Sequence, residues 1–199
     1  MKALLTALRW SILIGIFFMT SGTASAETKG HIFGEKGYDA RISGPSAANA
    51  DRFLVVYFAL ENPFDDKIRA ALERGGTIRY SFEVEIETGR FLQKKTVAHR
   101  SVTRTLKHDV LRGEYIVISG PDPPRVTGLK SLEETKRFAF DHISIPMAPI
   151  ERLHKGTTYR VRARVFIEQL GPEKPFEALL SIFSSSGYGS PWHESEFTY

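Results

Sequence analysis

Two segments in which apolar and charged residues alternate constrain the fold more than any other feature. Between Tyr80 and Glu87, alternate residues are apolar and the residues between them are polar and mostly acidic. Between Thr158 and Leu170, apolar residues alternate with Arg160, Arg162 and Arg164. Because side chains of a strand point alternately to its two faces, each segment is expected to be a strand with one buried and one charged face. Such one-sided strands favour antiparallel sheets.

Further strands are expected around these two segments, from residues rich in β-branched and aromatic side chains. The pattern predicts a strand pair over 38–43 and 52–60, a strand over 91–106 that returns antiparallel to the first alternating segment, a strand over 114–119, an extended piece over 178–183 and a closing strand over 192–199. These segments give about seven to nine strands in hairpin and meander order.

Two short helices interrupt this series of strands. Asn62-Pro63 is expected to begin a helix that Gly75-Gly76 ends, since Asn caps orphan amides and Gly ends helices. Ser131 is expected to cap a second helix, and Pro146 and Pro149 to end that helical region. We therefore predict a mainly β fold, an antiparallel β-sandwich (meander) with two short helical insertions; an open barrel is the alternative.

The N-terminal segment Met1 to Ala26 has the order of a cleaved signal peptide. A basic head with Lys2 and Arg9 precedes a short apolar run, and Ala24-Ser25-Ala26 fits a signal peptidase. An uncleaved membrane anchor is the alternative, but the charge-free run is shorter than the roughly 20 apolar residues that span a bilayer. We expect cleavage before Glu27, a flexible leader over 27–37, a single β-rich domain over 38–199, and a periplasmic location with no transmembrane anchor after cleavage.

Charge and cysteine content limit the partners and the sources of stability. Two of the 27 Lys and Arg lie in the signal segment, which leaves 25 cationic residues against 23 acidic ones. This near balance predicts no nucleic-acid partner. The chain has no Cys, so neither disulfides nor a lipid on cysteine can contribute, and packing must stabilise the fold.

Several segments together resemble a family of exported bacterial proteins known as domain of unknown function 4390. They are the signal peptide, residues 71–78 before 82–86, the strand over 158–165, and the C-terminal stretch over 184–197 with its Ser-rich turn and Trp192. The stretch from Gly187 to Pro191 departs from the family pattern. The resemblance implies no catalytic residues. It implies an envelope context, because members look like genomic companions of membrane sensor kinases of the nitrogen-regulation type.

The charged rows allow two interpretations. If their strands are neighbours, Glu83, Glu85 and Glu87 can pair with the arginines across the sheet. Alternatively, Arg160, Arg162 and Arg164 are exposed and bind an anionic ligand or an acidic protein surface, since the guanidinium binds carboxylate or phosphate through two hydrogen bonds. Tyr188 and Trp192 are further candidate binding residues, because their rings can stack on a ligand.

Catalytic and metal sites lack a clear signature. The six His have no short-spaced pairing of the kind that metal sites use, so we predict no metal and no cofactor. Ser190 lies near His193 and Glu194, but the nucleophile-elbow pattern Gly-x-Ser-x-Gly is absent there. We expect a non-enzymatic protein-interaction module of the envelope. The alternatives are a carrier of lipid or small ligands with a cavity lined by Phe82, Val84, Val161 and Val165, and a serine hydrolase at Ser190 and His193.

Overall fold

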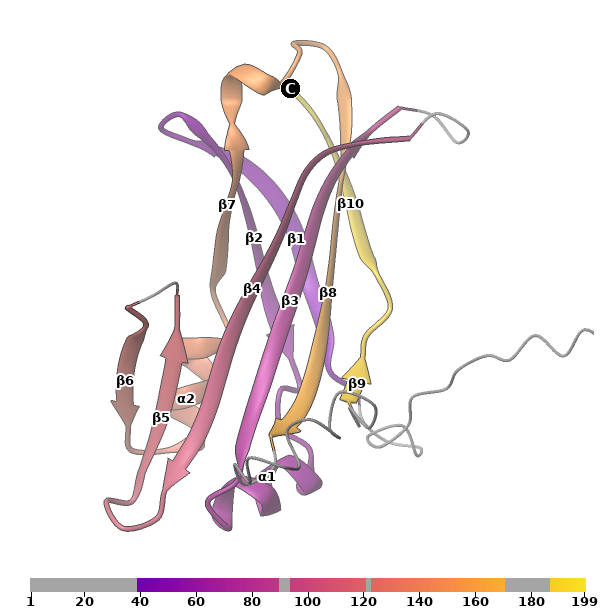
Figure 1. Ribbon diagram of the computed structural model, residues 1–199. Helices are drawn as coiled ribbons and strands as arrows, with labels where there is room; N and C mark the ends of the chain where they lie inside the picture. Colours follow the sequence, from indigo (N-terminus) through magenta and orange to yellow (C-terminus); the bar gives the residue numbers. More distant parts are fainter. Residues whose placement is uncertain (1–38, 90–93, 121–122, 171–186) are drawn as a thin grey trace, which may run out of the picture.

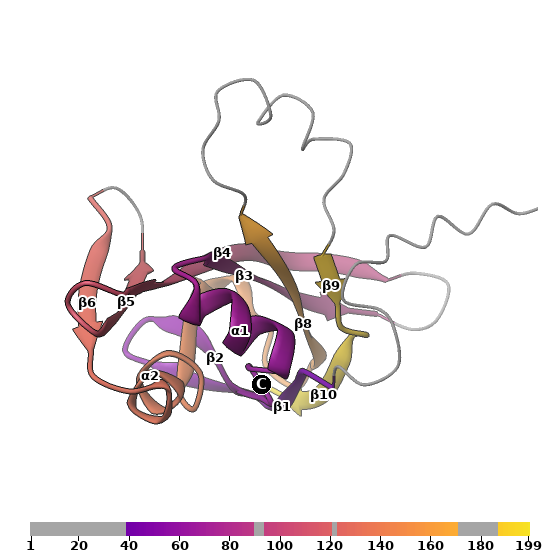
Figure 2. The ribbon, with the colours of Figure 1, turned by 90° about the horizontal axis from the view of Figure 1, so that it is seen from below.

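The chain folds into two antiparallel sheets that face each other. The structure, a computed structural model, describes residues 39–89, 94–120, 123–170 and 187–199. The smaller sheet has the order β1-β2-β7, and the larger has the order β10-β8-β3-β4-β5-β6, with β9 paired to β8. Figure 1 shows the larger sheet in front of the smaller one, and Figure 2 shows them as two layers. The predicted mainly β, antiparallel sandwich is confirmed.

The smaller sheet joins distant parts of the chain. Its strands are β1 (Arg41–Ala50), β2 (Phe53–Glu61) and β7 (Ile143–Pro149). The predicted pairing of the first two strands is confirmed, with a bulge in β1 between Ser43 and Ser46. Strand β7 was not predicted, because Pro146 and Pro149 indicate an end to regular structure. Both prolines are tolerated because β7 lies at the edge of the smaller sheet and pairs there only with β2.

The larger sheet contains both alternating segments at its centre. Its strands are β3 (Thr77–Thr88), β4 (Lys95–Asp109), β5 (Glu114–Ser119), β6 (Arg125–Leu129), β8 (Thr158–Leu170), β9 (Gly187–Gly189) and β10 (His193–Thr198). Strands β3, β4 and β5 form the predicted meander. Strand β3 also pairs with β8, although about 70 residues separate them. Strand β6 was not predicted; it continues the meander at the edge of the sheet.

The core lies between the two sheets. From β3 it takes the apolar set of the first alternating segment, and from β8 the apolar set of the second, all of them fully or almost fully buried: Tyr80, Phe82, Val84, Ile86, Tyr159, Val161, Ala163, Val165 and Ile167. The ring of Phe82 lies 5.6 Å from that of Phe58 on β2, so aromatic side chains of the two sheets are in contact. This burial of large apolar side chains is the main driving force for the fold.

Two helices close parts of this core. Helix α1 (Asp66–Glu73) lies at one end of the sandwich and buries Ile68, Ala71 and Leu72 (Figure 2). Its N-cap is Asp65, whose side chain accepts a hydrogen bond from the Ile68 amide, and the prediction of Asn62 as cap is wrong. Asn62 instead has a positive φ of 51° and donates to the Asp39 carbonyl, so it turns the chain before the helix.

Helix α2 (Leu132–Ala139) follows the predicted capping pattern. The Ser131 hydroxyl accepts from the Glu134 amide at 3.1 Å, and Glu134 accepts from the amide of Lys130 at 2.9 Å. The helix ends at Phe140, whose ring lies 4.6 Å from that of Tyr80. A short 3-10 turn, η1 (Ile150–Arg152), connects β7 to the segment before β8.

Some predicted segments lie outside the described residues. They are the signal peptide over 1–26, the leader over 27–37 and the extended piece over 178–183. In the part of the chain that is described, no helix is long and apolar enough to cross a membrane.

Candidate functional site

The acidic and basic rows of the two alternating segments face each other across neighbouring strands. In the register of β3 and β8, Glu83 is opposite Arg164, Glu85 opposite Arg162, and Glu87 opposite Arg160. All six residues point to the outer face of the larger sheet, because the residues between them form the core. The structure therefore agrees with the interpretation in which the two rows pair.

Each of the three guanidinium groups is held by carboxylates. Nη2 of Arg164 lies 2.6 Å from Glu83, and Nη1 of Arg162 lies 2.9 Å from Glu87 and 3.5 Å from Glu85. Strand β10 extends the pairing on the other side of β8. There, Nε of Arg162 lies 2.9 Å from Glu194, and Nη2 of Arg160 lies 2.9 Å from Glu196. Because its guanidinium donates to Glu196, the pKa of Arg160 is raised above its ordinary value.

Trp192 stacks on this row of arginines. The guanidinium carbons of Arg162 and Arg164 each lie 4.4 Å from the centre of the Trp192 ring, and that of Arg164 also lies 4.6 Å from the ring of Phe166. Two cations above one indole, each also paired with a carboxylate, fix the ring in place. We call this surface the arginine-tryptophan face. It consists of Glu83, Glu85, Glu87, Arg160, Arg162, Arg164, Phe166, Trp192, Glu194 and Glu196.

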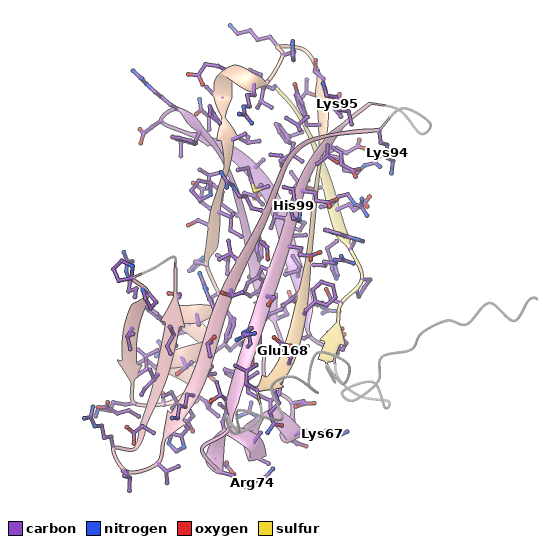
Figure 3. The ribbon with its side chains drawn as sticks, viewed as in Figure 1. Lys67, Arg74, Lys94, Lys95, His99 and Glu168 are labelled. Atoms are coloured by element: carbon purple, nitrogen blue, oxygen red, sulfur yellow. The ribbon has the colours of Figure 1, made fainter. Side chains whose placement is uncertain are left out.

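Four other cations lie at opposite ends of the sandwich. Figure 3 shows Lys94 and Lys95 at one end of the sandwich and Lys67 and Arg74 at the other, where Lys67 belongs to α1 and Arg74 is its C-cap. Lys94 lies 3.9 Å from Glu87.

Tyr188 belongs to a different part of the molecule from Trp192. Its hydroxyl donates to the carbonyl of Ala40 at 2.8 Å, and so ties β9 to the start of β1. Burial raises the pKa of this hydroxyl above its ordinary value. Of the five predicted binding residues, the structure therefore brings together the three arginines and Trp192, and places Tyr188 elsewhere.

The hydroxyl of Ser190 forms its hydrogen bonds with backbone groups and not with His193. The oxygen accepts from the Val165 amide at 3.0 Å, and the hydroxyl donates to the Pro191 carbonyl at 3.0 Å. Ser190 is also buried. The buried Nε2 of His193 has no hydrogen-bond partner among the described residues. A serine nucleophile needs a hydrogen bond to its base, and these two described side chains do not form one.

Within the described ranges, no group of three or more His, Asp or Glu side chains is placed to hold a metal ion.

Arg104 is a cation on the inner face of β4. It is opposite Tyr80 on β3 and Ser119 on β5. Its Nη1 is buried and makes no hydrogen bond to any described residue. Burial lowers the pKa of Arg104. This cation was not singled out from the sequence, because the alternation of β4 is imperfect and places Arg100 and Arg104 in the same set as Val102 and Leu106.

The outer face of the smaller sheet differs from the arginine-tryptophan face in carrying no charge along its middle. On β2, Leu54, Val56 and Phe58 point into the core, so the residues between them point outward. The outward-facing residues of the three strands are small, hydroxyl-bearing, prolyl or aromatic: Ser46, Ala48, Phe53, Val55, Tyr57, Ala59, Ser144 and Pro146. We call this surface the uncharged face. Phe53 and Tyr57 are 47% and 39% exposed.

A groove of about 510 Å³ opens at one end of the uncharged face. Tyr57 and Ala59 of β2 line it, together with Ser43 and Gly44 from the bulge of β1. Asp141 and His142, which precede β7, and Ile143 and Ser144, which begin it, complete the groove. The groove was missed from the sequence because its walls come from three segments whose proximity depends on the unpredicted pairing of β7 with β2.

Comparison with known sequences gives one family match. The sequence profile of a family described as a domain of unknown function (DUF4390) matches residues 38–196. No curated protein and no solved structure matches the chain.

Proposed function

The chain belongs to the family of the domain of unknown function (DUF4390), and we propose that it is an exported, non-enzymatic module that binds a protein partner in the bacterial envelope. The arginine-tryptophan face is its contact surface. One observation carries this proposal: the guanidinium groups of Arg162 and Arg164 both lie 4.4 Å from the centre of the Trp192 indole.

Such an arrangement suits protein recognition because it is already ordered. Trp and Arg are the residue types that most often dominate binding energy at protein interfaces. Immobilising a flexible side chain on binding costs about 0.5–1.5 kcal/mol, and here ion pairs hold the arginines before any partner arrives. Phe166, 36% exposed beside Arg164, adds apolar area to the same surface.

The charges on this face indicate the chemistry of its partner. Five Glu outnumber three Arg, and all three guanidinium groups are paired with carboxylates, which does not favour an anionic ligand. Glu194 and Glu196 remain 41% and 57% exposed. A partner that presents Lys or Arg at the rim of its contact surface complements them. The resemblance to companions of membrane sensor kinases supports the periplasmic part of such a kinase as the first partner to test.

Export is supported by the order of basic, apolar and small residues over Met1 to Ala26. We expect the periplasmic protein to begin at Glu27. N-terminal sequencing of the protein from an envelope fraction tests this, and a chain that still carries Met1 or Lys2 contradicts it.

The partner is tested by site-specific photo-crosslinking in intact cells. A photoreactive amino acid at Phe166 is expected to capture one reproducible protein. The same amino acid at Val126, an exposed residue on β6 of the same sheet, serves as the matched control and is expected to give no such product. Equal products at both positions, or none at Phe166, contradict the proposal.

Two variants of Trp192 test whether the crosslink depends on the contact between this ring and the arginines. Trp192→Ala is expected to remove most of the product at Phe166, whereas Trp192→Phe keeps an aromatic ring against the arginines and is expected to retain part of it. Circular dichroism of both variants checks that the sheets still form. An undiminished crosslink in folded Trp192→Ala contradicts a role for the stack.

A carrier with its cavity between the sheets finds less support. Phe82, Val84, Val161 and Val165, the side chains expected to line such a cavity, are fully buried members of the core. The ring of Phe58 from the opposite sheet packs against Phe82.

A further inference from the structure

We propose that the groove beside Tyr57 is a binding site for a neutral saccharide. The site lies on the uncharged face, on the other sheet from the arginine-tryptophan face. It therefore adds a second ligand class to the protein partner and does not depend on that partner. Its volume of about 510 Å³ is within the range of roughly 300–1,000 Å³ that small-molecule sites occupy.

The groove owes its shape to local features of the three segments that line it. The bulge in β1 between Ser43 and Ser46 interrupts the ladder next to Ala59. Gly44 in this bulge has a φ of 60°, and a Cβ added there would meet no atom within 4 Å. Ala59 contributes only a methyl group between larger neighbours. These small residues leave a hollow beside Tyr57.

The polar groups of the groove suit a ligand rich in hydroxyls. The carboxylate of Asp141 and the imidazole of His142 line the groove, and neither has a hydrogen bond or ion pair with another described residue. Ser144 adds a hydroxyl group that can both donate and accept. A sugar offers hydroxyls that donate to the carboxylate and accept from the imidazole or serine, and its C–H face can pack on the ring of Tyr57.

Other ligand classes fit these groups less well. No Lys or Arg is among the lining residues, and Asp141 repels an anion such as a phosphate. A purely apolar ligand would cover Asp141, His142 and Ser144 without giving them hydrogen-bond partners, which is unfavourable. A cation could contact both Asp141 and the ring of Tyr57, so the experiment includes one.

The experiment is a titration of the protein, produced from the full-length sequence, followed by amide chemical shifts in NMR spectra. The probes are chitotetraose and maltotetraose as neutral saccharides and tetralysine as the cation. At least one saccharide is expected to give saturable shifts centred on Ser43, Tyr57 and Ser144. No saturable shift with either saccharide, or saturation at these residues by tetralysine alone, overturns the proposal.

Variants of the groove sharpen the result. Tyr57→Ala is expected to weaken saccharide binding about tenfold, whereas Tyr57→Phe keeps the ring and most of the affinity. Asp141→Ala is expected to weaken binding by a similar factor, since it removes the acceptor. Phe53→Ala removes a more exposed aromatic ring from the same face but outside the groove, and is expected to leave the affinity unchanged. An equal loss in Phe53→Ala contradicts the assignment.

The two proposals fail independently. Tyr57→Ala is expected to leave the crosslink at Phe166 intact, and Trp192→Ala to leave saccharide binding intact, because the two sites lie on different sheets.

Discussion

The outer face of β3 and β8 is built from ion pairs, whereas the outer face of β2 and its neighbours carries hydroxyl, methyl, prolyl and aromatic side chains. On the arginine-tryptophan face, each Arg lies against at least one Glu, and removal of one member leaves another charge without its partner. On the uncharged face, the side chains have few polar partners, and removal of one of them leaves no charge without its partner. The side chains of the arginine-tryptophan face are therefore ordered by their ion pairs with one another. Those of the uncharged face have no such pairs, which leaves them free to contact a ligand.

The largest expected difference between the faces is in stability. Arg162 is 20% exposed and contacts Glu85, Glu87 and Glu194. Breaking a fully buried pair costs about 3–5 kcal/mol, and the partial exposure reduces this, so Arg162→Ala is expected to lower the free energy of unfolding by about 2–3 kcal/mol. Tyr57→Ala on the uncharged face is expected to lower it by about 1 kcal/mol or less. Urea unfolding of both variants measures the difference, and equal losses would remove the distinction.

Arg104 tests whether pairing, rather than charge itself, makes the difference. This guanidinium lies on the inner face of β4, and its buried Nη1 has no partner among the described residues. Replacing an uncompensated cation by an apolar side chain of similar length is expected to raise the free energy of unfolding by about 1 kcal/mol in Arg104→Met. Arg162→Met serves as the control, in which the same replacement is expected to destabilise. A loss of stability in Arg104→Met would show that this cation is satisfied in the fold.

A double-mutant cycle isolates one ion pair of the arginine-tryptophan face. Arg164 donates to Glu83 through Nε at 2.8 Å and Nη2 at 2.6 Å, and a coupling free energy of about 1 kcal/mol is expected from Glu83→Ala, Arg164→Ala and the double variant. The more exposed pair of Arg79 and Glu168, with one contact at 3.1 Å, is the control and is expected to couple by about 0.5 kcal/mol. Thermal or urea unfolding gives both values. A larger coupling in the control pair would contradict the role of burial.

The sequence predicts the charged face much better than the uncharged one, and the reason is local. Alternation over Tyr80 to Glu87 determines which side chains are buried without knowledge of the neighbouring strand. The complementary charges then favour β8 as the neighbour of β3, and the structure shows that Arg164 is opposite Glu83. Trp192 was singled out as a ring that could stack, but its contact with two arginines was not predicted, since this contact depends on the register of β10 and β8.

The groove could not be predicted for a different reason. The walls of the groove depend on β7, and the two prolines of this strand locally predict an end of regular structure. The edge position that makes Pro146 tolerable is a property of the whole sheet.

The cap of α1 was also predicted at the wrong residue. Asp65, three residues after Asn62, caps the helix. Asn and Asp are both preferred caps, so residue type alone does not choose between the two positions.

The smallest expected effect is on the stability of the protein at acidic pH, and it comes from Glu61 at the border of the uncharged face. Hydrogen bonds from Arg41 and Ser43 lower the pKa of Glu61 below its ordinary value of 4.5. Because the folded-state pKa is lower than the unfolded one, the contribution of Glu61 to stability is complete above the unfolded value and is lost as the pH falls through the folded value. Glu61→Gln is therefore expected to show a slightly weaker loss of stability below about pH 4.5 than the parent protein. Urea unfolding at a series of pH values measures this slope. NMR titration of the Glu61 carboxyl carbon gives the direction of the shift separately, and a midpoint at or above 4.5 would contradict the role of Arg41 and Ser43.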